Sequence, residues 1–344
     1  MFNIFRKSEA LLDKALQIIP GGTGTFSKSH TLYPRGISPF YLSHGKGSHV
    51  WDVDGNEYID FVNGLTAVTL GYQDDDVDGA VREQMGNGVI FGLPHKLEID
   101  VAELICEMVP CAEMVRYGKN GSDATSGAVR LARAYTGRDH VAHCGYHGWQ
   151  DWSNGVTGRN AGVPQAVKDL THTFEYNNPE SLERLMKDRP NQYACVIMEP
   201  MNREYPRDNF LEKCQAIAHK WGALFILDEV ITGFRFANGG AQELFGITPD
   251  LATFGKGIAN GYPLSAIAGK AEIMRKFTDV HYSFTYSGEC LSLAAAKATL
   301  TKLKNEPVCF HLSRHGTMVK EWVWENSPQA DIYTTGFPAW IHLN

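Results

Sequence analysis

Hydrophobic and polar positions along the chain change their spacing at about residue 75. Before this point, apolar residues recur at helical intervals over residues 8–19, and a segment rich in Gly and Pro follows at 20–39. Residues 48–61 then alternate between apolar and polar on both sides of Asp54-Gly55. Alternation around an Asp-Gly pair predicts a β-hairpin. We therefore expect a helix and a hairpin here, as part of a small lobe.

From residue 75 onward, helical spacing alternates with short apolar runs. The helical spacing predicts helices over 76–87, 97–109, 124–136, 180–188, 209–221 and 289–304. The apolar runs predict strands over 114–117, 140–144, 193–198, 223–227, 251–254 and 264–268. Runs such as CVIM and ALFIL have no polar face, which is typical of strands covered on both sides.

These patterns predict an α/β fold in which a mostly parallel sheet lies between helices. We expect residues 1–74 to form the N-terminal part of a smaller α+β lobe and residues 75–305 to form the large domain. Residues 306–344 are expected to begin the C-terminal part of the small lobe and to leave it incomplete.

Composition narrows the class of protein. The 344 residues are 43% hydrophobic and 21% charged, with a net charge of −7, which argues against a nucleic-acid or membrane-surface partner. The amphipathic N-terminus predicts no signal peptide, and no apolar run is long enough to span a membrane. Seven scattered cysteines without a CxxC pair predict reduced thiols in a cytoplasmic protein.

Candidate chemistry follows the strands, where ligands collect in parallel α/β sheets. Gly121, Ser122 and Asp123 lie between a predicted strand and a predicted helix. Small residues at a helix start can bind phosphate through backbone N–H groups. The alternative is that Ser122 or Asp123 only caps the helix.

The next strand is followed by Tyr146 and His147, between glycines. An aromatic ring in this place can lie flat on a planar ligand, although loop packing is the alternative. A metal site built from His140, His143 and His147 is not expected. His140 and His143 fall on opposite faces of a strand, and no other ligand completes the set.

Acidic residues and one lysine follow three further strands. Glu199 and Asp228 each come directly after an apolar run, where a carboxylate is costly to desolvate unless a cation meets it. Lys256 stands between Gly255 and Gly257 at the end of another run. A buried lysine loses its proton readily and becomes a nucleophile, whereas a lysine that reaches solvent does not.

A phosphate site, a flat aromatic ring, an acid and an amine together match one ligand, pyridoxal 5′-phosphate. Enzymes that use this cofactor pair a Schiff-base lysine with an acidic partner for the pyridinium nitrogen. An NAD dehydrogenase is disfavoured because no GxGxxG follows a predicted strand.

The same motifs make the sequence resemble the class III (fold-type I) pyridoxal-phosphate aminotransferases, in the branch of glutamate-1-semialdehyde 2,1-aminomutase and its aminotransferase relatives. The resemblance covers nearly the whole chain in order. It is carried by PGG (20–22), DGN-Y-D (54–60), NGSDAT (120–125), RLAR-YTGR (130–138), YHG (146–148), EP (199–200), DEV-TGFR (228–235), PD-FGKG--NG-P (249–263) and T-SG (285–288).

The resemblance implies a catalytic set of Lys256, Asp228 and Tyr146. Lys256 would form the Schiff base and shuttle the substrate proton, and Asp228 would keep the pyridine nitrogen protonated. Tyr146 would cover one face of the ring and Val230 the other.

It further implies that Gly121, Ser122, Asp123 and His147 contact the cofactor. Glu199 is a carboxylate near the cofactor or on the substrate side. Thr285 matches a threonine that reaches the phosphate of the neighbouring subunit, which implies a homodimer with shared sites.

Three departures from the family pattern bear on function. Lys28 stands where the aminomutase has an arginine that binds the substrate carboxylate, and lysine lacks the bidentate fork. Glu289-Cys290 replace the usual Asn-Pro after T-SG. The family runs several dozen residues beyond the final segment YTTGFPAWIHLN.

We therefore expect a homodimeric aminotransferase that moves an amino group from an amino-acid donor to a carbonyl acceptor. The alternatives are a glutamate-1-semialdehyde aminomutase and a truncated cofactor-binding protein with little activity.

Overall fold

The computed structural model describes residues 4–327 and 332–344. The chain divides into two compact units, Met1–Asp75 and Asp76–Asn344, and each is described by itself. The three-part division expected from the sequence stays a prediction.

The first unit contains a helix and a small antiparallel sheet. Its elements are α1 (Arg6–Ile18), η1 (Pro20–Gly22), η2 (Phe26–Lys28), η3 (His30–Leu32), β1 (Leu42–Lys46), β2 (His49–Asp52), β3 (Glu57–Ile59) and α2 (Asn63–Thr66). The strands pair in the order β1-β2-β3, so the predicted hairpin is confirmed as β2–β3. The buried carboxylate of Asp52 accepts hydrogen bonds from Asp54, Asn56 and Tyr58 and fixes the turn.

The second unit is built on a seven-stranded sheet in the order β4-β10-β9-β8-β7-β5-β6. The strands are β4 (Met114–Gly118), β5 (His140–Cys144), β6 (Thr171–Thr173), β7 (Tyr193–Met198), β8 (Leu224–Asp228), β9 (Leu251–Phe254) and β10 (Ser265–Gly269). Only β10 runs against its neighbours, so the predicted mostly parallel sheet is confirmed.

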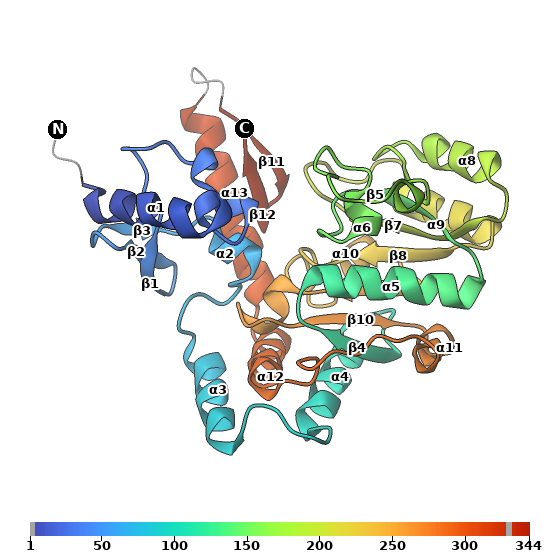
Figure 1. The fold of residues 1–344 in the computed structure, drawn as a ribbon, viewed down its shortest axis with the longest axis horizontal. Helices are drawn as coiled ribbons and strands as arrows, with labels where there is room; N and C mark the ends of the chain where they lie inside the picture. Colours follow the sequence, from blue (N-terminus) through green and yellow to red (C-terminus); the bar gives the residue numbers. More distant parts are fainter. Residues whose placement is uncertain (1–3, 328–331) are drawn as a thin grey trace. The chain divides into compact units, whose positions relative to one another are not determined.

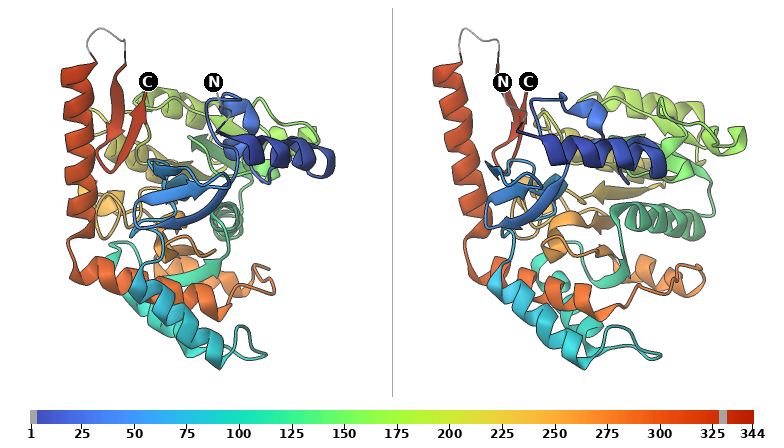
Figure 2. Two further views of the ribbon diagram at one scale, coloured as in Figure 1. Left: turned by 90° about the vertical axis from the view of Figure 1, so that its left-hand side faces the viewer. Right: turned by 60° about the vertical axis from the view of Figure 1, so that its left-hand side comes forward.

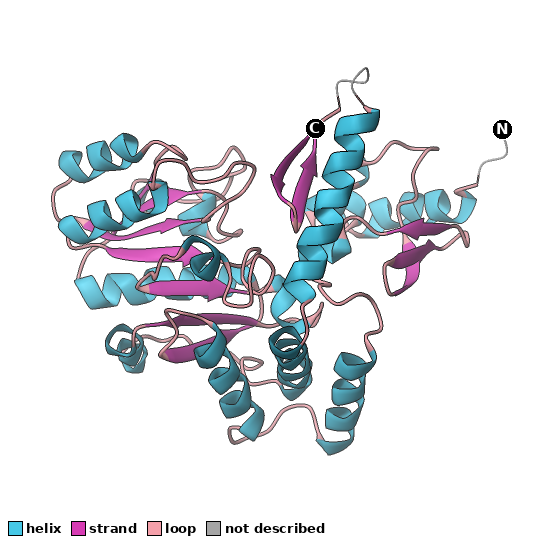
Figure 3. Ribbon diagram, turned by 180° about the vertical axis from the view of Figure 1, so that it is seen from behind, coloured by secondary structure: helices cyan, strands magenta, loops and turns pink. Residues whose placement is uncertain are grey.

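Helices cover both faces of this sheet (Figure 1, Figure 3). On one face α5 (Gly121–Thr136) packs against β7, β9 and β10; on the other, α9 (Phe210–Lys220) packs against β7 and β8 and also contacts α8 (Pro179–Asp188). Side chains of β8 alternate between the two layers, Leu224 and Ile226 toward α5, and Phe225 and Leu227 toward α9. The continuously apolar strands of the sequence are therefore strands buried on both faces.

The remaining helices of the second unit surround this core. They are α3 (Asp75–Asn87), α4 (Lys96–Met108), α6 (Asp151–Asn154), α7 (Gln165–Lys168), α10 (Ala241–Phe245), η4 (Lys256–Ala259), α11 (Ala271–Met274), η5 (Arg275–Thr278), α12 (Cys290–Asn305) and α13 (Val308–Asn326). The helix α13 runs beside a hairpin of β11 (Thr334–Phe337) and β12 (Trp340–Leu343) (Figure 2).

Candidate active site

Four neighbouring strands of the large sheet have their carboxyl ends on the same side of the sheet, and each has a residue singled out in the sequence at or just after that end. Along β9, β8, β7 and β5 these are Lys256, Asp228, Glu199 and Tyr146. Neighbouring strands lie about 4.8 Å apart. The strand order therefore brings residues that are far apart in sequence to one edge of the sheet.

Asp228 is the last residue of β8, and its carboxylate is buried. One oxygen, Oδ1, accepts hydrogen bonds from the Thr253 hydroxyl at 3.0 Å and from the Val230 N–H at 3.1 Å. The other, Oδ2, lies 2.7 Å from Nδ1 of His147. Because these partners fix both oxygens, the carboxylate has a defined direction at the edge of the sheet.

His147 is the buried link between Asp228 and the helix α5. Its ring stacks on Trp152 with centroids 6.0 Å apart, and its backbone carbonyl accepts the Thr125 hydroxyl at 2.7 Å. The carboxylate of Asp228 is an acceptor, so Nδ1 carries the proton. The opposite ring nitrogen, Nε2, is buried and has no hydrogen-bond partner among the described residues.

Lys256 begins η4, separated from the end of β9 by Gly255 alone, and has a left-handed φ of 43°. Burial lowers the pKa of its amine; Asp228 and Glu199 oppose this shift, and Arg235 adds to it. Gly255, just before it, is the point where a Cβ would lie only 3.3 Å from Val230. The glycine thus allows a close backbone approach beside a lysine whose neutral form is favoured.

Glu199 follows β7 and is buried. Its Oε2 accepts hydrogen bonds from the Tyr146 N–H and from Asn202, both at 3.1 Å. Burial raises the pKa of this carboxyl, and the nearby Asp228 raises it further. Tyr146 itself, held by this backbone bond, exposes 65% of its surface.

The N-terminus of α5 lies against the same edge. A Cβ on Gly121 would lie 2.8 Å from Val230, so only glycine allows this approach. Ser122 accepts the Trp149 N–H at 3.3 Å. Asp123 forms a capping box with Asn120, because its Oδ2 accepts the N–H of Asn120 at 2.9 Å. Asp123 therefore caps the helix, as the alternative interpretation of the sequence expected, and a contact of Asp123 with a cofactor stays a prediction.

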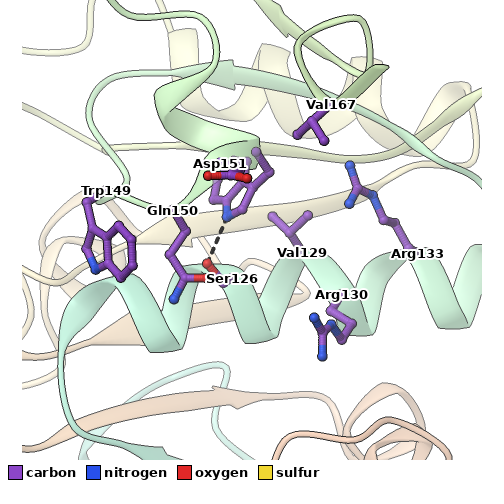
Figure 4. A pocket seen from close by; sticks show the side chains of 9 residues that line it. Ser126, Val129, Arg130, Arg133, Trp149, Gln150, Asp151 and Val167 are labelled. Atoms are coloured by element: carbon purple, nitrogen blue, oxygen red, sulfur yellow. Dashed lines mark hydrogen bonds between the residues drawn. The ribbon is translucent and has the colours of Figure 1, made fainter. Parts of the chain in front are cut away.

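Beyond Trp149 a hollow of about 410 Å³ lies between α5 and the segment 149–152 (Figure 4). Trp152 closes one wall by donating from Nε1 to the Ser126 hydroxyl at 2.9 Å. Arg130 and Arg133 project from α5 in different directions along this hollow (Figure 4). The hydrogen bond to Ser126 fixes the Trp152 ring, and the Trp152 ring in turn stacks on the ring of His147.

Lys28 and Thr285, the remaining two predicted site residues, are both exposed. Lys28 belongs to the first unit, where it is exposed at the end of η2 and lines a cavity of about 600 Å³. Thr285 is exposed in the segment between η5 and α12.

Four further residues were missed in the sequence: Thr253, Asn202, Trp152 and Arg235. Thr253 pairs with Asp228 in the β8–β9 register and is a polar residue inside the apolar run LATF, which could have indicated it. Arg235 belongs to TGFR, and its buried guanidinium has a pKa lowered to about 10 by desolvation.

The described residues fit a pyridoxal phosphate cofactor. A fixed buried carboxylate suits a protonated ring nitrogen, a buried lysine of lowered pKa suits an aldehyde, and the N-terminus of a 16-residue helix suits a phosphate. A Cβ at Gly121 would clash with Val230, and a Cβ at Gly255 would make a tight contact with it, so the backbone approaches Val230 closely at both positions. Over residues 4–327 and 332–344, no group of three or more His, Cys, Asp or Glu could hold a metal ion.

Comparison with known proteins gives the same class. The family model of class-III aminotransferases matches residues 32–332. A 3-aminobutyryl-CoA aminotransferase of Cloacimonas acidaminovorans is 38% identical over 88% of this chain and 74% of its own. A glutamate-1-semialdehyde 2,1-aminomutase of Syntrophomonas wolfei is 40% identical over 89% of this chain and 74% of its own.

A solved structure is also closely similar. The internal-aldimine form of the FumI protein from Sphingopyxis sp. MTA144, with bound pyridoxal phosphate, superposes with a TM-score of 0.93 at 28% identity, covering 98% of this chain and 83% of its own. The chain belongs to the class III aminotransferases, which use pyridoxal 5′-phosphate. The expected family, fold and cofactor are therefore confirmed.

Proposed function

We propose that this enzyme transfers an amino group from an amino acid to a carbonyl acceptor, with Lys256 and Asp228 as its main catalytic residues. The proposal rests on one observation at the carboxyl ends of the strands. There the buried Lys256, whose pKa is lowered, lies near the carboxylate of Asp228, which three hydrogen-bond partners fix. The cofactor supplies an aldehyde that condenses with amines and a pyridinium ring that withdraws electrons.

Each residue then has a stated task. Lys256 binds the aldehyde as a neutral amine and afterwards moves a proton at the substrate carbon that carries nitrogen. Asp228 holds a proton at the ring nitrogen, and His147 orients Asp228. Tyr146 covers one face of the ring and Val230 the other.

The phosphate end of the cofactor has its own residues. Gly121 and Ser122 bind the phosphate at the start of α5, where N–H groups favour an anion. Asp123 supports this site by capping the helix. Glu199, with its raised pKa, lies on the substrate side as a carboxyl that is protonated more readily than usual.

An aminomutase is the second candidate, because an aminomutase is as similar to this chain as an aminotransferase is. Lys28 argues against the aminomutase, because it stands where the aminomutase has an arginine and lacks the bidentate fork that binds the substrate carboxylate. The name of the Cloacimonas relative adds β-amino acyl thioesters to the substrates worth testing.

The proposed assembly is a homodimer in the cytoplasm. Support comes from a neighbouring pair of segments, 89–93 and 284–290, which are joined by the Cys290 N–H to Val89 carbonyl bond of 2.8 Å. Both expose large apolar side chains, namely Val89, Ile90, Phe91, Leu93 and Tyr286. All seven cysteines are free, as suits a reducing compartment. No described helix is long and apolar enough to span a membrane.

The deciding experiment is a half-reaction. Enzyme loaded with cofactor is mixed with one amino donor at a time, and release of the keto acid is measured without an acceptor. We expect release from at least one donor, whereas rearrangement of glutamate semialdehyde without release would establish the aminomutase instead.

The companion test is Lys256→Ala. Borohydride reduction should attach the cofactor covalently to the wild-type peptide that contains Lys256, and not to the variant, whose circular dichroism should be unchanged. Attachment at another lysine in the wild type would remove Lys256 from its proposed role.

A further inference from the structure

We propose that the ion pair between Lys119 and Glu289 is a positioning pair, which holds the Thr285 segment in the geometry needed to bind the cofactor phosphate. The proposal rests on the function proposed above and on the expected role of Thr285, which matches a threonine that reaches the phosphate of the neighbouring subunit. It concerns Glu289, one of the two residues that replace the usual Asn-Pro after the T-SG motif.

The beginning of the Thr285 segment is attached to β4 and α5. The ring of Tyr282 fills a slot where Gly118 and Gly127 have no side chains; a Cβ on Gly118 would lie 2.5 Å from its hydroxyl. Arg116 donates to the Tyr282 carbonyl at 3.0 Å, and Arg130 donates to the carbonyl of the preceding residue at 3.1 Å. Backbone and ring are therefore both fixed at this end.

The end of the segment is attached through Glu289, the N-cap residue of α12. Its carboxylate accepts hydrogen bonds from the Leu291 N–H at 2.6 Å and from the Ser292 hydroxyl at 2.7 Å, and the Lys119 amine lies 2.9 Å away. The side chains of Lys119 and Glu289 are only 17% and 12% exposed. Burial alone would raise the pKa of Glu289, but the bonds from Ser292 and Lys119 outweigh it and hold the pKa below its usual value.

Lys119 connects this anchor to the start of α5. Its backbone N–H donates at 3.0 Å to Asp123 Oδ2, the oxygen that also accepts the Asn120 N–H in the capping box around Gly121 and Ser122. The pair thus joins the N-termini of α5 and α12, two helices of 16 residues each. Residues 283–288 form a bridge that is attached at both ends to β4, α5 or the residues between them, and α5 carries the proposed phosphate site. Because Thr285 lies on this bridge, the pair sets where its hydroxyl can reach.

Glu289→Gln distinguishes a positioning role from a purely electrostatic one, because the two predict opposite changes in phosphate binding. Glu289→Gln removes a negative charge near the start of α5, which by charge alone would strengthen phosphate binding. If the pair positions Thr285, the same change weakens binding, because a neutral amide holds Lys119 less firmly than a carboxylate does. The glutamine oxygen can still accept from the N–H groups of α12, so the helix cap is largely kept.

The test measures the dissociation constants of the apoenzyme for pyridoxal 5′-phosphate and for pyridoxal, which lacks the phosphate. We expect Glu289→Gln and Thr285→Ala each to weaken binding of the phosphate form about tenfold, the size of one charge-assisted hydrogen bond. Pyridoxal binding should change less than about twofold, and the double variant should bind no worse than Thr285→Ala alone.

Lys297→Met is the matched control, because Lys297 is also on α12 and pairs with Asp100 at 2.7 Å, away from the bridge. It should leave both constants unchanged. Unchanged or tighter phosphate-form binding by Glu289→Gln, a parallel loss of pyridoxal, or effects that multiply in the double variant would overturn the proposal. If Glu289→Gln does not fold, Lys119→Met combined with Thr285→Ala gives the same test of non-additivity. Wild-type protein that binds neither form would instead contradict the proposed function.

Discussion

At the scale of single residues, Lys256 owes its chemistry to its surroundings. Burial favours the neutral amine, while the carboxylates of Asp228 and Glu199 favour the ammonium form, and burial is the larger effect. A neutral amine is the form that attacks an aldehyde. The opposing carboxylates still keep a proton available nearby, which a residue that both binds and returns protons requires.

This balance predicts a pH dependence for covalent attachment of the cofactor. An ordinary lysine has a pKa of about 10.4. Because the pKa of Lys256 is lowered, its neutral fraction at any pH below that value is larger than that of an ordinary lysine. The rate of borohydride-reducible attachment should rise with pH and reach half its maximum below pH 10.4. A midpoint at or above the ordinary value would show that Lys256 is solvated.

The sequence indicated Lys256 and Asp228 because each follows an apolar run, and the ends of parallel strands share an edge. It did not indicate the bond from Thr253 to Asp228, since that contact exists only because β8 and β9 are neighbours. Asn202 was missed for a similar reason, because nothing local shows that its amide turns back to Glu199.

At the scale of elements, the start of α5 depends on the absence of side chains. The sequence predicted this helix from residue 124, but it begins at Gly121 because Asn120 and Asp123 form a capping box. Polar caps extend a helix beyond its apolar pattern. The extra turn is the part that faces Val230 and carries the proposed phosphate site.

We predict that Gly121→Ala weakens cofactor binding and that Val230→Ala partly restores it. The new Cβ would lie 2.8 Å from the Val230 Cγ1 atom, so α5 must shift. Overpacking of this kind costs about 1–3 kcal/mol, roughly a tenfold loss of affinity if it falls on the bound state. Titration of the apoenzyme with cofactor measures the effect. If the double variant binds no better than Gly121→Ala alone, the contact with Val230 is not the cause.

The buried carboxylate of Asp250 connects three segments of the second unit, namely α9, the start of β8 and the residue that follows β10. It accepts hydrogen bonds from the Phe225 N–H at 2.8 Å, from His219 at 2.7 Å and from Lys270 at 2.6 Å. Burial alone would raise the pKa of Asp250, but the hydrogen bonds from Lys270, Phe225 and His219 outweigh it and lower the pKa.

Asp250→Asn should therefore lower the free energy of unfolding at pH 7 by about 2 kcal/mol, because the Lys270 ammonium loses its charged partner and the other hydrogen bonds to this buried side chain weaken. A carboxyl with a lowered folded pKa stabilises the protein above its unfolded pKa of 3.8, and the effect is lost as pH falls through the folded value. Urea unfolding should show the wild-type advantage at pH 7 and its decline below about pH 4. An advantage that persists at lower pH would mean that the charge is not its source.

At the scale of the whole molecule, the sequence predicted the kind of sheet but not the strand order. Apolar runs show that strands are covered on both faces. The strand order depends instead on long-range pairing, which places β10 between β4 and β9 and makes β6 an outermost strand. The helix α13 was also missed, since only Gly316 and Val323 along it are buried and its apolar pattern is weak. The particular donor and acceptor could not be predicted, because Lys28 indicates only that the substrate carboxylate is bound differently from that of the aminomutase.

The proposed homodimer gives a prediction at the same scale. Leu93 is 81% exposed in a segment that neighbours the Thr285 segment, and such a side chain is normally covered when it belongs to an interface. Leu93→Glu should shift the protein toward monomer, as measured by analytical ultracentrifugation. It should also weaken binding of pyridoxal 5′-phosphate, because Thr285 would no longer reach the partner's site.

Tyr135→Glu, which changes a 42% exposed aromatic near the end of α5, is the control and should alter neither measurement. A Leu93→Glu monomer that binds the cofactor as tightly as the wild type would show that each site is complete within one chain. An effect of the Lys119–Glu289 pair would then fall on its own subunit, so the two experiments together determine whether the Thr285 segment contacts the phosphate of its own site or of the partner's.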